Sequence, residues 1–139
     1  MKDCFDISLS PQAIGNLSSL ALAHVGDAVF ELLVRTWLIQ SGRATAKSLH
    51  KETVQLVRAG TQAQLLSAIH AQLTKEEQAV CRRARNAHTH MIPKSATPEE
   101  YHAATALEAL LGSLYLQGQR ERLEALFSQM MERYVQDAT

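Results

Sequence analysis

The chain has 139 residues, of which 46% are hydrophobic, 20% charged and 5% aromatic. This length fits one domain over residues 1–139, and the apolar fraction excludes an intrinsically disordered chain. Six glycines and three prolines are too few for a loop-rich all-β protein. The net charge is zero, yet residues 32–98 hold ten of the 14 Lys and Arg and three of the 14 Asp and Glu. A neutral total therefore does not exclude a polyanionic partner, because binding depends on where the charges lie.

Helix start and stop signals divide the chain into short helices. Thr74 with Glu77 forms a capping box, Thr61 is expected to cap a helix, and Gly42 is expected to stop one in the left-handed conformation. The expected helices cover residues 10–16, 18–40, 45–59, a segment from 61, 74–87, 97–118 and 119–136. No segment alternates with a period of two for long enough to predict a strand. The sequence predicts an all-α domain, a helical bundle of about six to seven helices.

The longest predicted helix is apolar around most of its circumference, which predicts a buried helix. It nevertheless contains His24, Asp27, Glu31 and Arg35 on one narrow stripe. In the simplest interpretation Glu31 pairs with Arg35, His24 hydrogen-bonds Asp27, and the stripe meets solvent. That interpretation explains Asp27 poorly, because the preceding Gly26 weakens the helix by about 1 kcal/mol relative to Ala and permits close approach by another chain or a ligand.

A second isolated acid supports a different interpretation. Glu108 is the only charged residue between Glu100 and Arg120, and no cation lies three or four positions from it. A carboxylate in such surroundings must be neutralised from another element or by a metal ion. Two carboxylates on two helices are ligands that Mg²⁺ uses, with water and phosphate oxygens completing its coordination. The residues therefore predict a metal site that opens onto a phosphate.

The segments around these acids resemble the ribonuclease III family. Leu22-Ala-His-Val-Gly-Asp-Ala-Val-Phe-Glu31 is similar to the family's signature helix, and Ala106-Leu-Glu-Ala-Leu-Leu-Gly-Ser-Leu-Tyr115 to its second acidic helix. With Arg83-Ala-Arg-Asn-Ala87 and the loop to Pro93-Lys94, the chain is similar to the Mini-ribonuclease III subfamily, which lacks the double-stranded-RNA-binding domain. The resemblance covers the whole chain in order.

This resemblance implies a homodimeric endonuclease that cuts double-stranded RNA in a valley between subunits. It implies that Asp27 and Glu108 bind Mg²⁺, with Mn²⁺ as a substitute, and act in catalysis. Acids found elsewhere in the family are replaced here by Leu20, Ala23 and Thr105, which leaves fewer carboxylates for a second metal. His24, Glu31 and Thr105 are expected beside the metal ligands. The subfamily implies a precursor of 23S ribosomal RNA as substrate, with a ribosomal protein or the pre-ribosome as partner.

RNA contacts must come from the catalytic domain itself. Residues 79–97 contain no acid, and this segment is expected to contact phosphates, with His88 and His90 adding charge at low pH. A second basic segment is equally well explained as a solvated helix face. The predicted RNA-binding residues are Lys47, His50, Lys51, Arg82, Arg83, Arg85, Asn86 and Lys94. A-form RNA is recognised mainly by shape and phosphate contacts, so we expect little sequence preference.

Two other functions remain open from the sequence. An all-α nucleotide pyrophosphohydrolase also holds Mg²⁺ on helix carboxylates, although such enzymes cluster several acids within one or two turns. A non-catalytic helical RNA-binding or scaffold protein would explain the replaced acids as a dead nuclease site.

The N-terminus lacks the layout of a signal peptide, and no apolar run of 18 residues is free of charge. We therefore expect a cytoplasmic protein with no membrane contact.

Overall fold

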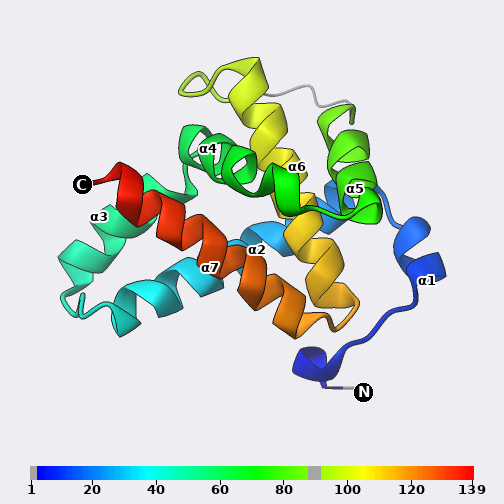
Figure 1. The fold of residues 1–139 in the computed structure, drawn as a ribbon, viewed down its shortest axis with the longest axis horizontal. Helices are drawn as coiled ribbons and strands as arrows, with labels where there is room; N and C mark the ends of the chain where they lie inside the picture. The colour runs from blue at the N-terminus through cyan, green and yellow to red at the C-terminus, as the bar shows by residue number, and fades with distance from the viewer. Residues whose placement is uncertain (1–2, 88–91) are drawn as a thin grey trace.

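The computed structural model describes residues 3–87 and 92–139, and every regular element in these ranges is helical (Figure 1). In chain order the elements are η1 (Cys4–Asp6), α1 (Pro11–Gly15), α2 (Ser19–Gln40), α3 (Ala46–Val57), α4 (Ala59–Ile69), η2 (His70–Gln72), α5 (Lys75–Arg85), α6 (Pro98–Leu116) and α7 (Arg120–Asp137). The predicted all-α class is confirmed. Within the described part of the chain, no helix combines the length and apolarity needed to cross a membrane.

Most helices begin close to where the sequence predicts, at side-chain caps. Ser18 and Thr45 accept hydrogen bonds from backbone amides three residues later, and Thr74 with Glu77 forms a complete capping box. These caps satisfy amides that have no partner inside the helix. Gly42 has a φ of +92°, as expected for a left-handed stop after α2. The helix boundaries therefore follow largely from local hydrogen bonding.

The start of α4 differs from the prediction. The helix begins at Ala59, with Arg58 as its N-cap and no capping bond from a side chain. Thr61, the predicted cap, lies inside the helix, and its hydroxyl donates to the carbonyl of Gln55 at 2.7 Å. Arg58 is extended, so α3 and α4 are separated by one residue. The predicted break at 59–60 was wrong because the chain turns at Arg58 instead of at Gly60.

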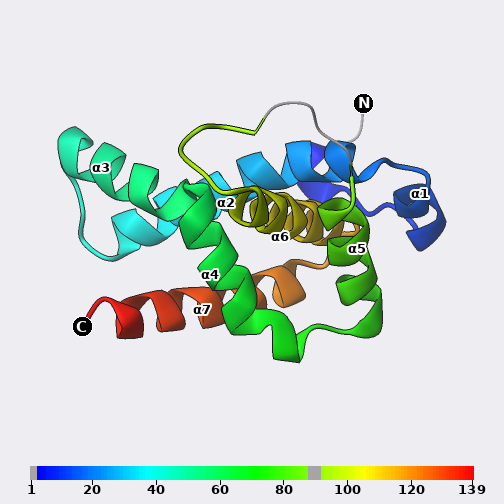
Figure 2. The same cartoon turned by 90° about the horizontal axis from the view of Figure 1, so that it is seen from above.

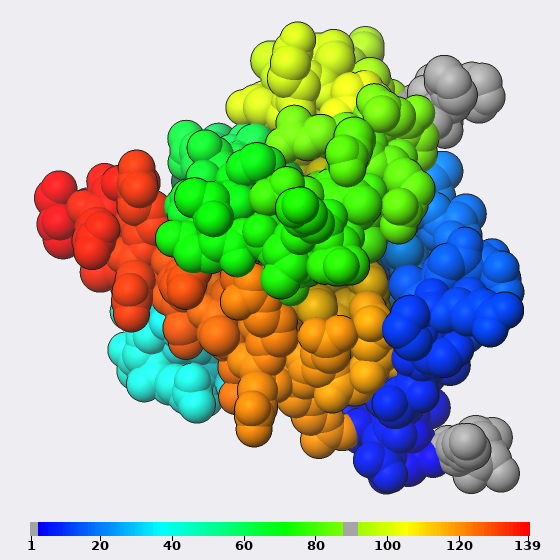
Figure 3. All heavy atoms as spheres, turned by 45° about the vertical axis from the view of Figure 1, so that its right-hand side comes forward, coloured from blue at the N-terminus to red at the C-terminus, as the bar shows by residue number. Residues whose placement is uncertain are grey.

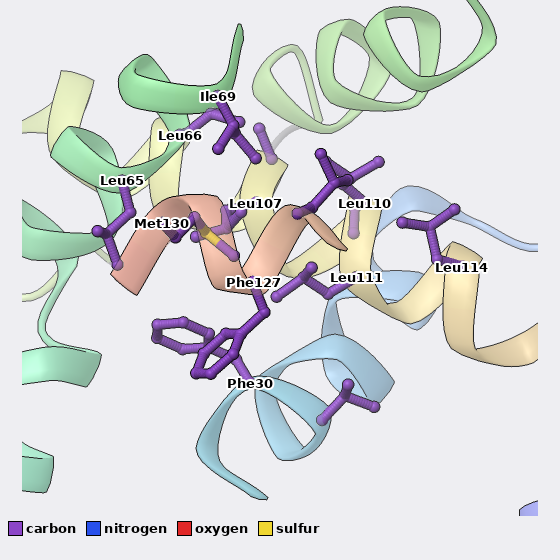
Figure 4. Packing of buried hydrophobic residues seen from close by; sticks show 14 of the residues in the cluster. Phe30, Leu65, Leu66, Ile69, Leu107, Leu110, Leu111, Leu114, Phe127 and Met130 are labelled. Carbon is purple, nitrogen blue, oxygen red and sulfur yellow. The ribbon is translucent and has the colours of Figure 1, made fainter. Parts of the chain in front are cut away.

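The central helix is α6. It lies between α2 on one side and α4 and α7 on the other, as Figure 2 shows, and the α4–η2–α5 stretch covers its middle in Figure 3. Its side chains Leu107, Leu110 and Leu111 are fully buried. They meet Phe30 from α2 and Met130 from α7 in the core (Figure 4).

The prediction that α2 is buried on all sides was wrong. Leu20, Leu32 and Ile39 on this helix are 45%, 58% and 58% exposed. The reason is that α2 lies on the outside of the bundle and packs through one face only, the face that includes Phe30 and Val34. Large apolar side chains of α2 are thus left uncovered by the described residues of this chain.

Candidate active site

The site is built where α2 and α6 cross at two glycines. A Cβ atom placed on Gly26 would overlap the carbonyl oxygen of Glu108, and one placed on Gly112 would overlap the carbonyl oxygen of Leu22. The backbones of the two helices therefore touch, which no larger residue permits at these positions. Asp27 follows Gly26 directly, and Glu108 lies one turn before Gly112. The close crossing brings two acids that are 81 positions apart in the chain to one place.

The carboxyl groups of Asp27 and Glu108 influence each other directly. Asp27 is exposed and Glu108 is half-buried. Burial and, to a smaller extent, the negative charge of Asp27 raise the pKa of Glu108, while a hydrogen bond from Gln62 opposes the rise, and the resulting pKa is about 8. The fold thus holds two carboxyl groups next to each other at a partly buried site. This arrangement is unfavourable unless a proton or a cation neutralises it.

No cation from the described part of the chain neutralises the pair. The ion pairs found there join Glu31 to Arg35, Glu77 to Arg122 and Arg133 to Asp137. Those residues also contain no group of three or more His, Cys, Asp and Glu able to enclose a metal ion. Two oxygen ligands fit Mg²⁺, which keeps several waters and takes phosphate oxygens from a substrate. They do not fit a closed structural metal site.

Two of the other residues expected beside the metal ligands, Glu31 and Thr105, have different partners. Glu31 pairs with Arg35 at 2.8 Å, the surface ion pair of the simplest interpretation. The Thr105 hydroxyl is buried and donates to the carbonyl of Tyr101 in its own helix at 3.0 Å. His24 is exposed one turn before Asp27, and no hydrogen bond to Asp27 is found among the described contacts. None of the three adds a ligand to the acid pair.

The predicted RNA-binding residues lie on two helices and in one loop. Lys47, His50 and Lys51 are exposed on α3. A second exposed set comprises Arg82, Arg83 and Arg85 on α5, Asn86 at its C-cap and Lys94 in the following loop. In both Figure 1 and Figure 2, α3 and α5 lie on opposite sides of α6. His88 and His90 lie outside the described residues.

Gln62 was missed by the sequence analysis. Its Nε2 donates to Oε2 of Glu108 at 3.5 Å and to the carbonyl of Val57 at 2.7 Å. Gln62 lies at helical spacing before the buried residues Leu65, Leu66 and Ile69, so it occupies the apolar face of α4. A polar residue on that face was the available signal.

Comparison with known proteins agrees with this geometry. The Ribonuclease III domain profile matches residues 20–119. The chain is 48% identical over 107 residues to Mini-ribonuclease 3 of Symbiobacterium thermophilum, covering 77% of this chain and 82% of the relative. It is 45% identical over 124 residues to Mini-ribonuclease 3 of Synechocystis sp., covering 87% and 85%. A crystal structure of a Fusobacterium nucleatum protein superposes with a TM-score of 0.78 at 33% identity, covering 87% of this chain and 97% of that one.

Proposed function

This chain belongs to the ribonuclease III family and is an endoribonuclease that acts on double-stranded RNA, and we propose that Asp27 and Glu108 are its metal-binding and catalytic residues. The observation that supports this assignment is the contact of the two acids across the α2–α6 crossing, with no cation from residues 3–87 and 92–139 beside them. Family membership also sets aside the nucleotide pyrophosphohydrolase that the sequence left open.

In this proposal the two carboxylates hold one Mg²⁺, or Mn²⁺ in its place. A divalent ion bound there supplies an acidified water and stabilises the charge that develops on the departing oxygen. Asp27, being exposed, presents its carboxylate to the substrate side, whereas the half-buried Glu108 provides a ligand fixed by its surroundings. The rigid helix crossing keeps both groups at a constant separation, which is the protein's main contribution to such chemistry.

The RNA duplex is proposed to contact the basic residues of α3 and α5. Arg82 and Arg83 are exposed on α5 and Lys47 and Lys51 on α3, and these helices lie on opposite sides of α6, so we expect a duplex that spans the acid pair to meet positive charge at both ends. Phosphate contacts make affinity fall as salt rises. We expect duplex binding to weaken steeply between about 50 and 200 mM salt, and a fluorescence-anisotropy titration that shows no change would contradict these contacts.

We propose that the exposed apolar side chains of α2 contribute to the contact between two copies of the chain. Leu20, Leu32 and Ile39 are 45%, 58% and 58% exposed on the single copy, and a contact between copies would remove these apolar side chains from water. Leu20 lies two helical turns before Asp27 on the same side of α2, so a second copy would sit beside the acid pair and form one wall of a valley. Sedimentation velocity should show a dimer, and Leu32→Glu should give a folded monomer. A dimer unchanged by Leu32→Glu would place the contact elsewhere.

The natural substrate is proposed to be the 23S ribosomal RNA precursor in the cytoplasm, presented by a ribosomal protein or the pre-ribosome. The Mini-ribonuclease III resemblance of the sequence implies this substrate, and the chain is similar to proteins named Mini-ribonuclease 3. Incubation of the purified chain with precursor transcripts, followed by mapping of the new ends, tests it. Cuts confined to the paired ends of the precursor are expected, and random cleavage along every duplex would contradict it.

The test of the enzyme itself is a cleavage assay on a long RNA duplex. The wild-type chain should cut in Mg²⁺ and not in EDTA. Asp27→Asn and Glu108→Gln should each lower cleavage to the EDTA background while leaving duplex binding intact, because the variants keep the shape of both side chains. Near-normal cleavage by either variant would refute the site, and no cleavage by the wild type would favour a non-catalytic RNA-binding protein.

A further inference from the structure

Gln62 and Gln78 make the same type of hydrogen bond near the starts of their helices. Gln62 is the fourth residue of α4, and Gln78 is the fourth residue of α5. Each donates from Nε2 to the backbone carbonyl five residues earlier, Gln62 to Val57 at 2.7 Å and Gln78 to Leu73 at 3.2 Å. This shared bond is a local feature of a helix start. Any further difference between the two glutamines must have another cause.

Gln62 differs from Gln78 in its burial and in a second bond. Gln62 is 3% exposed, whereas Gln78 is only half-buried. The Oε1 atom of Gln62 is buried and finds no hydrogen-bond partner among the described residues. Burying an amide with an unpaired oxygen is unfavourable. A local role, which Gln78 fulfils with a partly exposed side chain, therefore does not explain why Gln62 is buried.

The second bond of Gln62 supplies the explanation. An amide nitrogen has two hydrogens, and in Gln62 one is taken by the carbonyl of Val57, the last residue of α3, at 2.7 Å. The same nitrogen reaches Oε2 of Glu108 at 3.5 Å. The donor is thus fixed by α3 and α4, while the acceptor belongs to α6. A fixed donor restricts the torsions of a long glutamate side chain and so determines where its carboxylate meets that of Asp27.

We propose that Gln62 is a positioning residue that acts through Glu108, holding this carboxylate in the orientation in which it and Asp27 bind a divalent cation. The inference rests on the proposed function and assigns to it a residue from a third helix. Residues that orient metal ligands typically affect metal affinity or activity by about 10- to 100-fold when they are replaced. Gln62 should have an effect of that size although it does not touch the substrate.

Mn²⁺ binding to the full chain, measured by electron paramagnetic resonance, tests the proposal with a matched control. Gln62→Met keeps the length of the side chain but removes both hydrogen bonds, and we expect it to weaken Mn²⁺ binding by about 10- to 100-fold. It should lower kcat for duplex cleavage and leave KM nearly unchanged. Gln78→Met removes the same bond at the start of α5 and should bind Mn²⁺ as the wild type does.

A double-mutant cycle separates a positioning role from a purely structural one. If Gln62 acts through Glu108, adding Gln62→Met to the Glu108→Gln variant should cause no further loss of Mn²⁺ affinity. In the wild-type chain, the side-chain amide signals of Gln62 in a ¹H–¹⁵N spectrum should shift when Mg²⁺ is added, and those of Gln78 should not. This spectrum decides the question even where Gln62→Met does not fold.

Three results would overturn the positioning role: wild-type Mn²⁺ affinity in Gln62→Met, equal losses in Gln62→Met and Gln78→Met, or a Gln62 amide signal that Mg²⁺ does not move. Failure of the proposed function looks different. In that case Glu108→Gln itself would bind Mn²⁺ as tightly as the wild type, and both the metal site and the role of Gln62 would be refuted.

Discussion

Glu77 and Glu108 are both withdrawn from solvent on helices that pack against the core, yet their surroundings are opposite. Glu77 accepts hydrogen bonds from Nε and Nη2 of Arg122 at 2.9 and 2.8 Å, and this guanidinium lowers the pKa of Glu77. Burial and the charge of Asp27 raise the pKa of Glu108 to about 8. The chain supplies a cation to one acid and a second anion to the other. The ion pair of Glu77 and Arg122 joins α5 to α7. The two carboxylates of Asp27 and Glu108 are neutralised only when a cation binds from outside the chain.

The largest effect on stability should come from forcing apart α2 and α6, the helices that carry Asp27 and Glu108. Gly26→Ala or Gly112→Ala forces a methyl group into backbone of the opposite helix and should destabilise the chain by about 3 kcal/mol or more. Gly15 has open space around the position of a Cβ, so Gly15→Ala is the matched control and should change stability by less than about 1 kcal/mol. Urea unfolding measures all three. Similar effects at Gly15 and Gly26 would show that the crossing is not close.

Neutralising each glutamate should change stability in opposite directions. At pH 8 without divalent ions, Glu77→Gln removes the partner of Arg122 and should destabilise the chain by about 1–3 kcal/mol. Glu108→Gln removes a charge that is disfavoured by burial and by the repulsion from Asp27, and it should stabilise the chain by about 1–3 kcal/mol, less than the full pKa shift because Glu108 is not completely buried. The same unfolding measurement compares them. A loss of stability in both variants would mean that Glu108 is already neutralised within the chain.

The pH dependence should separate the two acids further. Glu77 has a lowered pKa, so its contribution is present above the ordinary value of 4.5 and is lost as the pH falls below it. Glu108 has a raised pKa, so the folded state loses stability as the pH rises from 4.5 to about 8. The difference in unfolding free energy between the wild type and Glu108→Gln should therefore grow between these values. A difference independent of pH would contradict the raised pKa.

Local signals in the sequence predicted much of the fold. Caps such as Ser18, Thr45 and Thr74 act on amides within the next three residues, so they are readable without the tertiary structure. The start of α4 could not be predicted in this way, because the Thr61 hydroxyl donates a hydrogen bond to the carbonyl of Gln55 in α3 instead of capping its own helix. The buried helix was also misassigned. Apolar composition favoured α2, whereas position in the bundle buries α6 and leaves Leu32 exposed.

The two acids of the site could be predicted from the sequence, whereas the residues that surround them could not. Asp27 and Glu108 stand out as charges in apolar helices, and Gly26 indicated a close approach by another chain. The element that approaches Gly26 is α6 of the same chain, which no periodicity specifies. Gln62 was missed because a glutamine near a helix start is ordinarily exposed. Its role depends on the distance to a residue 46 positions away.

Thermal unfolding at pH 8, with and without Mg²⁺, tests directly whether Asp27 and Glu108 bind a divalent cation. A ligand that binds only the folded state stabilises it, so Mg²⁺ should raise the unfolding midpoint of the wild type and of Glu77→Gln. It should leave the midpoints of Asp27→Asn and Glu108→Gln unchanged. An equal rise in all four proteins would show that Mg²⁺ binds elsewhere and would contradict the assignment of the site.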